Sequence, residues 1–172
     1  YYGRLHPDRP SYTVNTYFSR PGNGCHVHYS QDRVISQREA ARLQSFPDAF
    51  EFVGSLASIG KQIGNAVPPL LSYQIARCLG RTGYFVDLFC GAGGLGLGFK
   101  WAGWTSVLAN DIESKFLDTY TQNVHEATVL GSIAESKTFS NIVSIVKAVK
   151  ARATADARPL FILGGPPCQG FS

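Results

Sequence analysis

The stretch YFVDLFCGAGGLG, residues 84–96, decides the fold of this chain. Its first six residues, Tyr84 to Phe89, are mainly apolar and predict a buried strand. The glycines that follow allow a tight turn and close approach of a ligand to the backbone, and a helix is expected from there to about Trp101. Such a helix presents unpaired N–H groups toward the loop. A strand, a glycine loop and a helix in this order are typical of ligand-binding α/β proteins.

The chain after this unit alternates strands with helices. Strands are expected at 106–110, 128–130 and 160–163, and helices at 113–123 and 141–152. This alternation predicts a parallel sheet covered by helices, which is the α/β fold class.

The chain before this unit is expected to hold two helices. Residues 12–18 alternate and are prone to form a strand. Ser36 is a candidate helix N-cap, and Glu39 three residues later completes a capping box for a helix over 37–44. Residues 48–60 are expected to form a connector with at most one helical turn.

The second helix lies shortly before residue 84. It is expected from Leu70 to Leu79, with Pro69 in its first turn, where a missing N–H is tolerated. Residues 80–83 then form a short linker.

Size and composition limit the class of protein. A chain of 172 residues, 44% hydrophobic and 16% charged, fits one domain with a proper core. The net charge of +4 permits a polyanionic partner without requiring one. The four cysteines show no CxxC pair, so neither a metal site nor a disulfide framework is expected, and we expect reduced thiols in a cytosolic setting. No apolar run approaches the ~20 residues of a membrane span.

An acid follows the glycine loop at the spacing of a nucleotide site. Asp111, about 20 residues after Gly91, ends the second expected strand, where a carboxylate can bind ribose hydroxyls. The glycine loop could instead have only a structural role, as a turn that lets the helix pack closely on the strand. NAD is one candidate ligand, but Asp87 before the loop is unusual for a nicotinamide site and better suits a small adenosyl ligand with a charged tail.

A second motif, LGGPPCQGFS at 163–172, places a thiol after the expected strand at 160–163. Prolines fix φ, so the shape of this loop is set before a ligand binds. Cys168 would lie at the carboxyl end of a strand, where ligands of open α/β sheets gather. It is a candidate nucleophile, and a buried structural cysteine is the alternative.

Four blocks of the sequence resemble the DNA (cytosine-5) methyltransferase family: residues 36–47, 62–69, 87–94 and 165–172. In most members the glycine loop comes first and the Ile-Gly-Asn-Ala-Val block comes last. The order here is reversed, so the chain resembles a circularly permuted member. The resemblance implies a Rossmann-like, S-adenosylmethionine-dependent methyltransferase fold, α/β with a mostly parallel sheet and flanking helices.

The permuted order implies two parts of one catalytic domain. Residues 1–83 would be the late-motif segment, and residues 84–172 would bind the cofactor and carry the nucleophile. The family also needs a catalytic glutamate, an arginine motif and a target-recognition domain. We expect the rest of a longer chain, or a second subunit, to supply them.

The resemblance implies methyl transfer to C5 of a cytosine that is flipped out of double-stranded DNA. Cys168 matches the nucleophile, whose thiolate adds covalently to the ring so that C5 can accept the methyl group of S-adenosylmethionine, leaving S-adenosylhomocysteine. Gln169 and Ser172 match loop positions that approach DNA. No metal is implied, and a restriction-modification system is the expected setting.

The residues that match the family's cofactor contacts come from four places in the chain. They are Asn65 and Ala66, then Phe89, Gly91 and Gly93, then Asp111 and Ile112, and finally Ser132 and Ile133. Asp87 is a further candidate, because an acid before the loop suits the charged tail of the ligand. Asp111 stands where the family usually has a glutamate, and the shorter acid can serve. Ser132 departs from an aspartate that usually holds the adenine amino group.

Two other functions stay open. An inactive S-adenosylmethionine-binding partner or regulatory subunit of a split methyltransferase would keep the glycine loop, although the intact Cys168 argues against it. A nicotinamide-dependent oxidoreductase is the more remote alternative.

Overall fold

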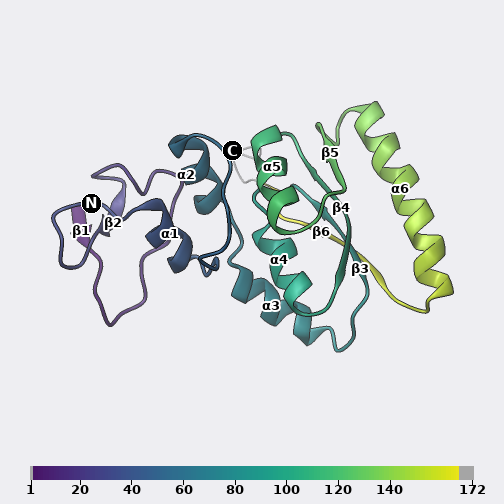
Figure 1. Cartoon of the computed structure of the whole chain (residues 1–172), viewed down its shortest axis with the longest axis horizontal. Coiled ribbons are helices and arrows are strands. Elements are labelled where there is room, and N and C mark those ends of the chain that lie inside the picture. Colours follow the sequence, from purple (N-terminus) through teal and green to yellow (C-terminus); the bar gives the residue numbers. More distant parts are fainter. Residues whose placement is uncertain (1, 167–172) are drawn as a thin grey trace.

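A four-stranded parallel sheet forms the centre of the computed structural model, which describes residues 2–166 (Figure 1). Its strands are β3 (Tyr84–Leu88), β4 (Thr105–Asp111), β5 (Thr128–Leu130) and β6 (Leu160–Gly164), in the order β5-β4-β3-β6. All three pairings are parallel. The predicted α/β class is confirmed, and so are all four strands expected after residue 83.

Strand β3 lies inside the sheet, between β4 and β6. Phe85 and Val86 are fully buried, as expected for a strand of a parallel sheet whose two faces are covered. Leu88 pairs with Asn110 on one side and with Gly164 on the other. The carboxyl ends of three strands therefore meet at one edge of the sheet, where the glycine loop and the loop after β6 both begin.

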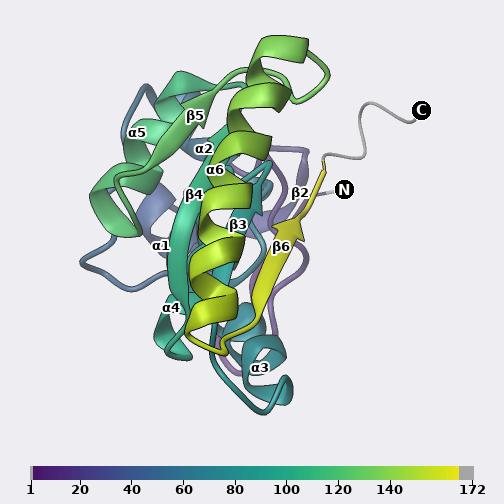
Figure 2. The same cartoon turned by 90° about the vertical axis from the view of Figure 1, so that its right-hand side faces the viewer.

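Helices cover both faces of this sheet (Figures 1 and 2). The longest, α6 (Ser136–Ala155), lies over one face, whereas α4 (Gly94–Trp101) and α5 (Ser114–Asn123) lie over the other. Helix α3 (Pro69–Cys78) packs alongside α4. Helix α6 extends beyond the predicted range 141–152, because its polar first turn carries no apolar periodicity.

The chain before residue 84 is less regular. Strands β1 (Tyr2–Arg4) and β2 (Gly24–Val27) form a parallel pair, and helices α1 (Gln37–Leu43) and α2 (Leu56–Gly64) follow. Helix α1 and its predicted capping box are confirmed.

The capping box of α1 also anchors the chain before it. The Ser36 N–H donates to Glu39 Oε2 at 2.7 Å, and the Glu39 N–H donates to Ser36 Oγ at 3.2 Å. Arg33 donates to both carboxylate oxygens of Glu39, at 2.7 and 2.8 Å. The Arg33 guanidinium, together with the Ser36 N–H and hydroxyl, lowers the pKa of Glu39 to about 2. The start of α1 is therefore held by a charge that persists across ordinary pH.

The predicted strand over 12–18 is wrong. The Tyr17 N–H donates to Asn15 Oδ1 at 2.8 Å, so the chain turns at this point. Val14 and Phe18 are buried and belong to the core. The apolar residues that suggested a strand therefore anchor a turn.

The predicted connector over 48–60 needs a correction as well, because α2 begins within it. Ser55 caps this helix by accepting the Ser58 N–H at 3.3 Å. Gly60 and Gly64 lower the helix propensity of this segment, so its sequence does not predict a helix. A Cβ on Gly64 would collide with the backbone of Asn15 and Thr16, so close packing requires a glycine there.

One hydrophobic core joins the chain before residue 84 to the sheet. It contains Phe46, Phe50 and Ile63 from the first part and Leu97 and Tyr120 from the second. The Phe46 and Phe50 rings lie 4.6 Å apart, centroid to centroid. The two parts therefore share apolar side chains in one core cluster.

Asn123, the last residue of α5, ties these two parts together by hydrogen bonds. Its Oδ1 accepts the Glu51 N–H at 3.0 Å, and its Nδ2 donates to the Glu51 carbonyl at 2.8 Å and to the Thr119 carbonyl at 2.7 Å. Two residues along, the Val53 N–H donates to Thr119 Oγ1 at 2.9 Å. Residues 51–53 are thus fixed against α5.

Replacing Asn123 by alanine is expected to lower the free energy of unfolding by roughly 1–2 kcal/mol, because it removes all three bonds of this side chain. Chemical denaturation of the wild type and the variant measures the change. Gln122→Ala, at an exposed position on the same helix, is the matched control and should change stability by less than about 0.5 kcal/mol. Equal effects of the two substitutions would show that the tie is unimportant.

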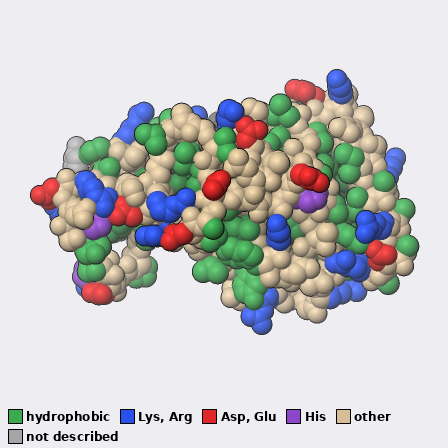
Figure 3. All heavy atoms as spheres, viewed as in Figure 1, with side chains coloured by type: hydrophobic (Ala, Val, Ile, Leu, Met, Phe, Trp, Pro, Cys, Tyr) green, Lys and Arg blue, Asp and Glu red, His purple; other side chains and the backbone are tan. Residues whose placement is uncertain are grey.

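The outer side of α3 is apolar. Leu70, Leu71 and Ile75 are exposed there, and Figure 3 shows hydrophobic side chains gathered over this helix at the lower centre of the view. Strand β6, at the edge of the sheet, has Ile162 61% exposed. Among the helices of residues 2–166, none is long and apolar enough to cross a membrane.

Candidate cofactor site

The loop after β3 has an unusual backbone conformation. Phe89, Gly91 and Gly93 have positive φ angles of 55°, 53° and 96°. Glycine adopts such angles readily, but a phenylalanine there is rare and carries strain of the kind that is kept at functional sites. The Cys90 N–H donates to the Asn110 carbonyl at 3.0 Å, and the Gly93 N–H donates to the Cys90 carbonyl at 2.9 Å. These bonds fix the loop at the carboxyl edge of the sheet.

Two glycines of this loop are also required by close packing. A Cβ on Gly93 would lie 2.8 Å from the Tyr120 ring, and a Cβ on Gly94 would collide with the Val67 carbonyl oxygen. Val67 belongs to the 62–69 block that sequence analysis singled out. The structure therefore brings this block against the start of α4, next to the glycine loop.

Asn65 and Ala66 of the same block lie where α2 ends. Asn65 is the exposed C-cap residue, and Ala66 is half-buried. The Gln44 side-chain nitrogen donates to the Ile63 carbonyl at 2.9 Å and to the Ala66 carbonyl at 3.4 Å. Sequence reasoning missed Gln44 as a positioning residue, since a polar residue at the end of a helix is not unusual.

The acid predicted to bind ribose hydroxyls is bonded to the glycine loop itself. Asp111 Oδ2 accepts the Gly91 N–H at 2.8 Å, and its Oδ1 accepts the Glu113 N–H at 3.0 Å. Asp111 is 9% exposed, whereas the adjacent Ile112 is 65% exposed. Gly91 and Asp111 are therefore in contact, and the exposed apolar side chain of Ile112 follows Asp111 in the chain. Their contact with a ligand stays a prediction.

Ser132 and Ile133 follow β5 at the same edge of the sheet, and both are half-buried. The buried Asn110 side chain donates to the Val129 carbonyl at 2.8 Å and to the Gly131 carbonyl at 2.9 Å. Asn110 therefore orders the loop that carries both residues. An amide directly before Asp111, at the carboxyl end of β4, is the signal that could have identified it.

Asp87 differs from the other predicted cofactor residues. It is fully buried in β3, and neither carboxylate oxygen forms a hydrogen bond of good geometry with a described group. Burial raises the pKa of Asp87 to about 7; the nearby Gly96 N–H and Tyr120 hydroxyl oppose this rise, and the Asp111 carboxylate adds to it. The Asp87 side chain does not reach the surface of the described structure. Its predicted contact with a ligand stays a prediction.

Three predicted site residues lie outside the described part of the chain: Cys168, Gln169 and Ser172. Strand β6 carries the chain to Gly164, which pairs with Leu88 just before the glycine loop. The loop that follows β6 therefore starts beside the loop that follows β3. Cys90 is buried, and burial raises the pKa of its thiol, so it stays protonated and unreactive.

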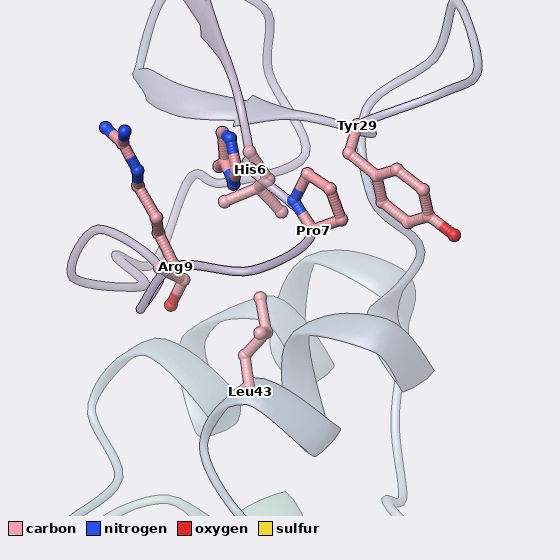
Figure 4. A pocket seen from close by; sticks show the side chains of 7 residues that line it. His6, Pro7, Arg9, Tyr29 and Leu43 are labelled. Carbon is pink, nitrogen blue, oxygen red and sulfur yellow. The ribbon is translucent and has the colours of Figure 1, made fainter.

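Two shallow hollows lie elsewhere, in the chain before residue 84. The first, of about 270 Å³, is shown in Figure 4 and is lined by Leu5, His6, Pro7, Arg9, Ser11, Tyr29 and Leu43. The second, of about 350 Å³, is lined by Asn15, Tyr17, Gly22, Asn23 and Gly24. The predicted cofactor residues line neither of them.

Within residues 2–166, no group of three or more His, Cys, Asp or Glu side chains could hold a metal ion.

A parallel α/β sheet with a glycine loop after an inner strand, and an acid bonded to that loop from the next strand, is typical of nucleotide-binding α/β folds. The family model described as C-5 cytosine-specific DNA methylase matches residues 3–81 and 83–172. The chain belongs to this family, and the resemblance noted from its sequence motifs is confirmed.

Known proteins match parts of this chain closely. The type II methyltransferase M.BbvI of Brevibacillus brevis is 52% identical over 69 residues, which cover 40% of this chain and 18% of that protein. The DNA (cytosine-5-)-methyltransferase M.ApeKI of Aeropyrum pernix is 51% identical over 80 residues, 45% of this chain and 16% of that protein. DNA (cytosine-5)-methyltransferase 1A of Oryza sativa subsp. japonica is 50% identical over 56 residues, 33% of this chain and 4% of that protein. The matches therefore span less than a fifth of each relative's length.

Proposed function

We propose that this chain carries the cofactor-binding and nucleophilic parts of a DNA (cytosine-5) methyltransferase. The observation that supports this best is the glycine loop between β3 and α4. Its Gly91 N–H binds Asp111, and its Gly94 lies against Val67. S-adenosylmethionine, when bound there, supplies an activated methyl group and leaves as S-adenosylhomocysteine.

The residues present fit that cofactor. The strained Phe89 and the loop glycines lead into the N-terminus of α4 at the carboxyl edge of the sheet, where a helix favours a polar or charged ligand group. Asp111 would keep its bond with the Gly91 N–H and accept ribose hydroxyls at the remaining acceptor sites of its carboxylate, and the exposed Ile112 would pack on the adenine. The remaining contacts would come from Asn65, Ala66, Gly93, Ser132 and Ile133.

The chemistry assigned to Cys168 is covalent. Its thiolate would form a bond to C6 of cytosine, which moves electron density to C5. C5 would then form a bond to the methyl carbon as the methyl–sulfur bond of the cofactor breaks. Loss of the C5 proton to a base, and departure of the thiolate, would restore the aromatic ring and free Cys168.

The order of the sequence blocks supports a circularly permuted catalytic domain. Residues 1–83 would be its late-motif segment, and residues 84–172 would hold the cofactor and the nucleophile. The shared core, the tie at Asn123 and the packing of Val67 on Gly94 support one domain made of both segments.

The catalytic glutamate and the target-recognition domain would come from the rest of a longer chain or from a second polypeptide. The open edge of β6, with the exposed Ile162, is where further strands could extend the sheet. Double-stranded DNA would be the substrate, approached by Gln169 and Ser172. The names of relatives such as M.BbvI, a type II methyltransferase, favour a role in restriction-modification.

Methyl transfer from radiolabelled S-adenosylmethionine to duplex DNA tests this function. The assay uses the longer protein, or this chain together with a polypeptide that carries the glutamate and the target-recognition domain. Label at C5 of cytosine is the expected result, and this chain by itself should bind the cofactor without turnover. Label on an exocyclic amino group would contradict the proposal. Cofactor binding without transfer under complemented conditions would favour an inactive cofactor-binding subunit.

A further inference from the structure

A fully buried carboxyl group lies beneath the glycine loop. Asp87 is in the central strand β3, two residues before the strained Phe89. Within the described part of the chain, no Lys, Arg or His side chain pairs with it, and neither oxygen forms a hydrogen bond of good geometry. An ionised carboxylate left unpaired in a protein interior is strongly destabilising. The arrangement calls for an explanation, because buried polar groups normally find partners.

Several elements of the fold meet at this carboxyl group. A Cβ built on Gly96 of α4 would lie 2.7 Å from Asp87 Oδ2 and 2.7 Å from the Tyr120 hydroxyl of α5. The Tyr120 hydroxyl in turn lies 3.3 Å from Ser106 Oγ of β4. We call Asp87, Gly96, Ser106 and Tyr120 the Asp87 cluster. It joins two strands and two helices directly under the loop.

Burial favours the neutral form of Asp87 and outweighs the Gly96 N–H and the Tyr120 hydroxyl, which lower its pKa. Burial is the main cause of the raised pKa of about 7, and the ionised Asp111 at the end of β4 pushes in the same direction. Burial and the neighbouring acids also raise the pKa of Tyr120 well above its usual value, so it remains a neutral hydroxyl. The buried Cys90 thiol is held neutral as well. With a proton on Asp87, the Asp87 cluster contains no charge.

We propose that Asp87 is a positioning residue that works as a neutral acid, its proton directed to the Tyr120 hydroxyl, and that it holds the first turn of α4 under the glycine loop. Loss of that proton would place a second negative charge near Asp111, at a buried position where no cationic side chain of residues 2–166 pairs with it. The loop would then be less firmly held. The consequence for S-adenosylmethionine binding rests on the function proposed above, whereas the protonation of Asp87 does not.

The proposal predicts a specific pH dependence of stability. The unfolded chain binds the Asp87 proton with an ordinary pKa of 3.8, and the folded chain binds it with a pKa of about 7. The contribution of this proton to stability is therefore complete below the unfolded value. It is lost progressively as pH rises through the folded value. Asparagine resembles the neutral acid in shape and cannot ionise, so Asp87→Asn should lack this loss.

Thermal unfolding of wild type and Asp87→Asn between about pH 5 and about pH 8 tests the proposal. The wild-type melting temperature should fall relative to that of the variant by on the order of 5–10 °C across this range. Asp118→Asn, at an exposed position on α5, is the matched control and should follow the wild type. A difference between wild type and Asp87→Asn that stays constant with pH would overturn the proposal.

A second measurement covers the case in which the variant does not fold. A ¹³C NMR titration of the aspartate carboxyl groups in the wild-type chain should show one of them titrating near pH 7. Ordinary titration of every aspartate would overturn the proposal.

Titration with S-adenosylhomocysteine separates this proposal from the proposed function. The wild type should bind several-fold more weakly at about pH 8 than at about pH 5, whereas Asp87→Asn should bind equally at both. If the wild type binds at neither pH, the proposed function fails, and the melting data still decide the state of Asp87. Equal pH dependence in wild type and variant would overturn the link between Asp87 and the loop.

Discussion

Replacing Cys168 by alanine is expected to abolish the covalent adduct that a methyltransferase forms with duplex DNA containing 5-fluorocytosine. Fluorine at C5 cannot leave as a proton does, so the bond between the thiolate and C6 persists after methyl transfer. Without the thiol no such bond can form, and methyl transfer to normal DNA should fall on the order of 10³-fold or more. Denaturing gel electrophoresis of the complemented enzyme with labelled duplex measures the adduct.

Cys78→Ala is the matched control for this experiment. Cys78 is the exposed free thiol at the end of α3, and its removal should leave the adduct intact. Cys90→Ala is unsuitable, because Cys90 lies in the core. An undiminished adduct in Cys168→Ala, or its loss in Cys78→Ala, would contradict the assignment of the nucleophile.

Replacing Asp111 by alanine should weaken the binding of S-adenosylhomocysteine by roughly 10–100-fold, as expected for the loss of charged hydrogen bonds to ribose. The same change removes the bond to the Gly91 N–H, so the loop loses its tie to β4. Isothermal titration calorimetry measures the affinity. Both effects act in the same direction, so a large loss is expected.

Asp111→Glu separates the role of the charge from that of the chain length. The longer acid keeps the carboxylate and is the residue that the family usually has here, so affinity should stay within about threefold of the wild type. Asp118→Ala removes an exposed acid that pairs with Lys115 on α5, and should have no effect on binding. Wild-type affinity in Asp111→Ala would show that this acid does not hold the ligand.

The part of the fold that sequence predicted best is the part with strong hydrophobic periodicity. The apolar runs at Tyr84 and Leu160 correctly predicted the strands β3 and β6, and the capping box at Ser36 correctly predicted the start of α1. Errors occurred where a local side chain overrode the pattern. Asn15 bends the chain by accepting the Tyr17 N–H, which no period of apolar residues can reveal.

The site residues were predicted from spacing and from the family resemblance, whereas the residues that hold them in place were not predicted. The spacing between Gly91 and Asp111 predicted a ribose-binding acid; the structure bonds the two residues to each other, and the contact with ribose stays a prediction. Gln44 and Asn110 were missed because they act through backbone carbonyls of other segments, and such bonds depend on the tertiary fold. The burial of Asp87 was also beyond sequence reasoning, because an acid in an apolar strand looks the same whether it faces a ligand or a helix.

Calorimetric titration of the wild-type chain with S-adenosylhomocysteine, and separately with NAD, tests the central claim most directly. That claim is that the loop between β3 and α4 binds S-adenosylmethionine. It predicts saturable binding of S-adenosylhomocysteine at one site per chain and no heat of binding with NAD. Binding of NAD in its place, or of neither compound, would contradict it.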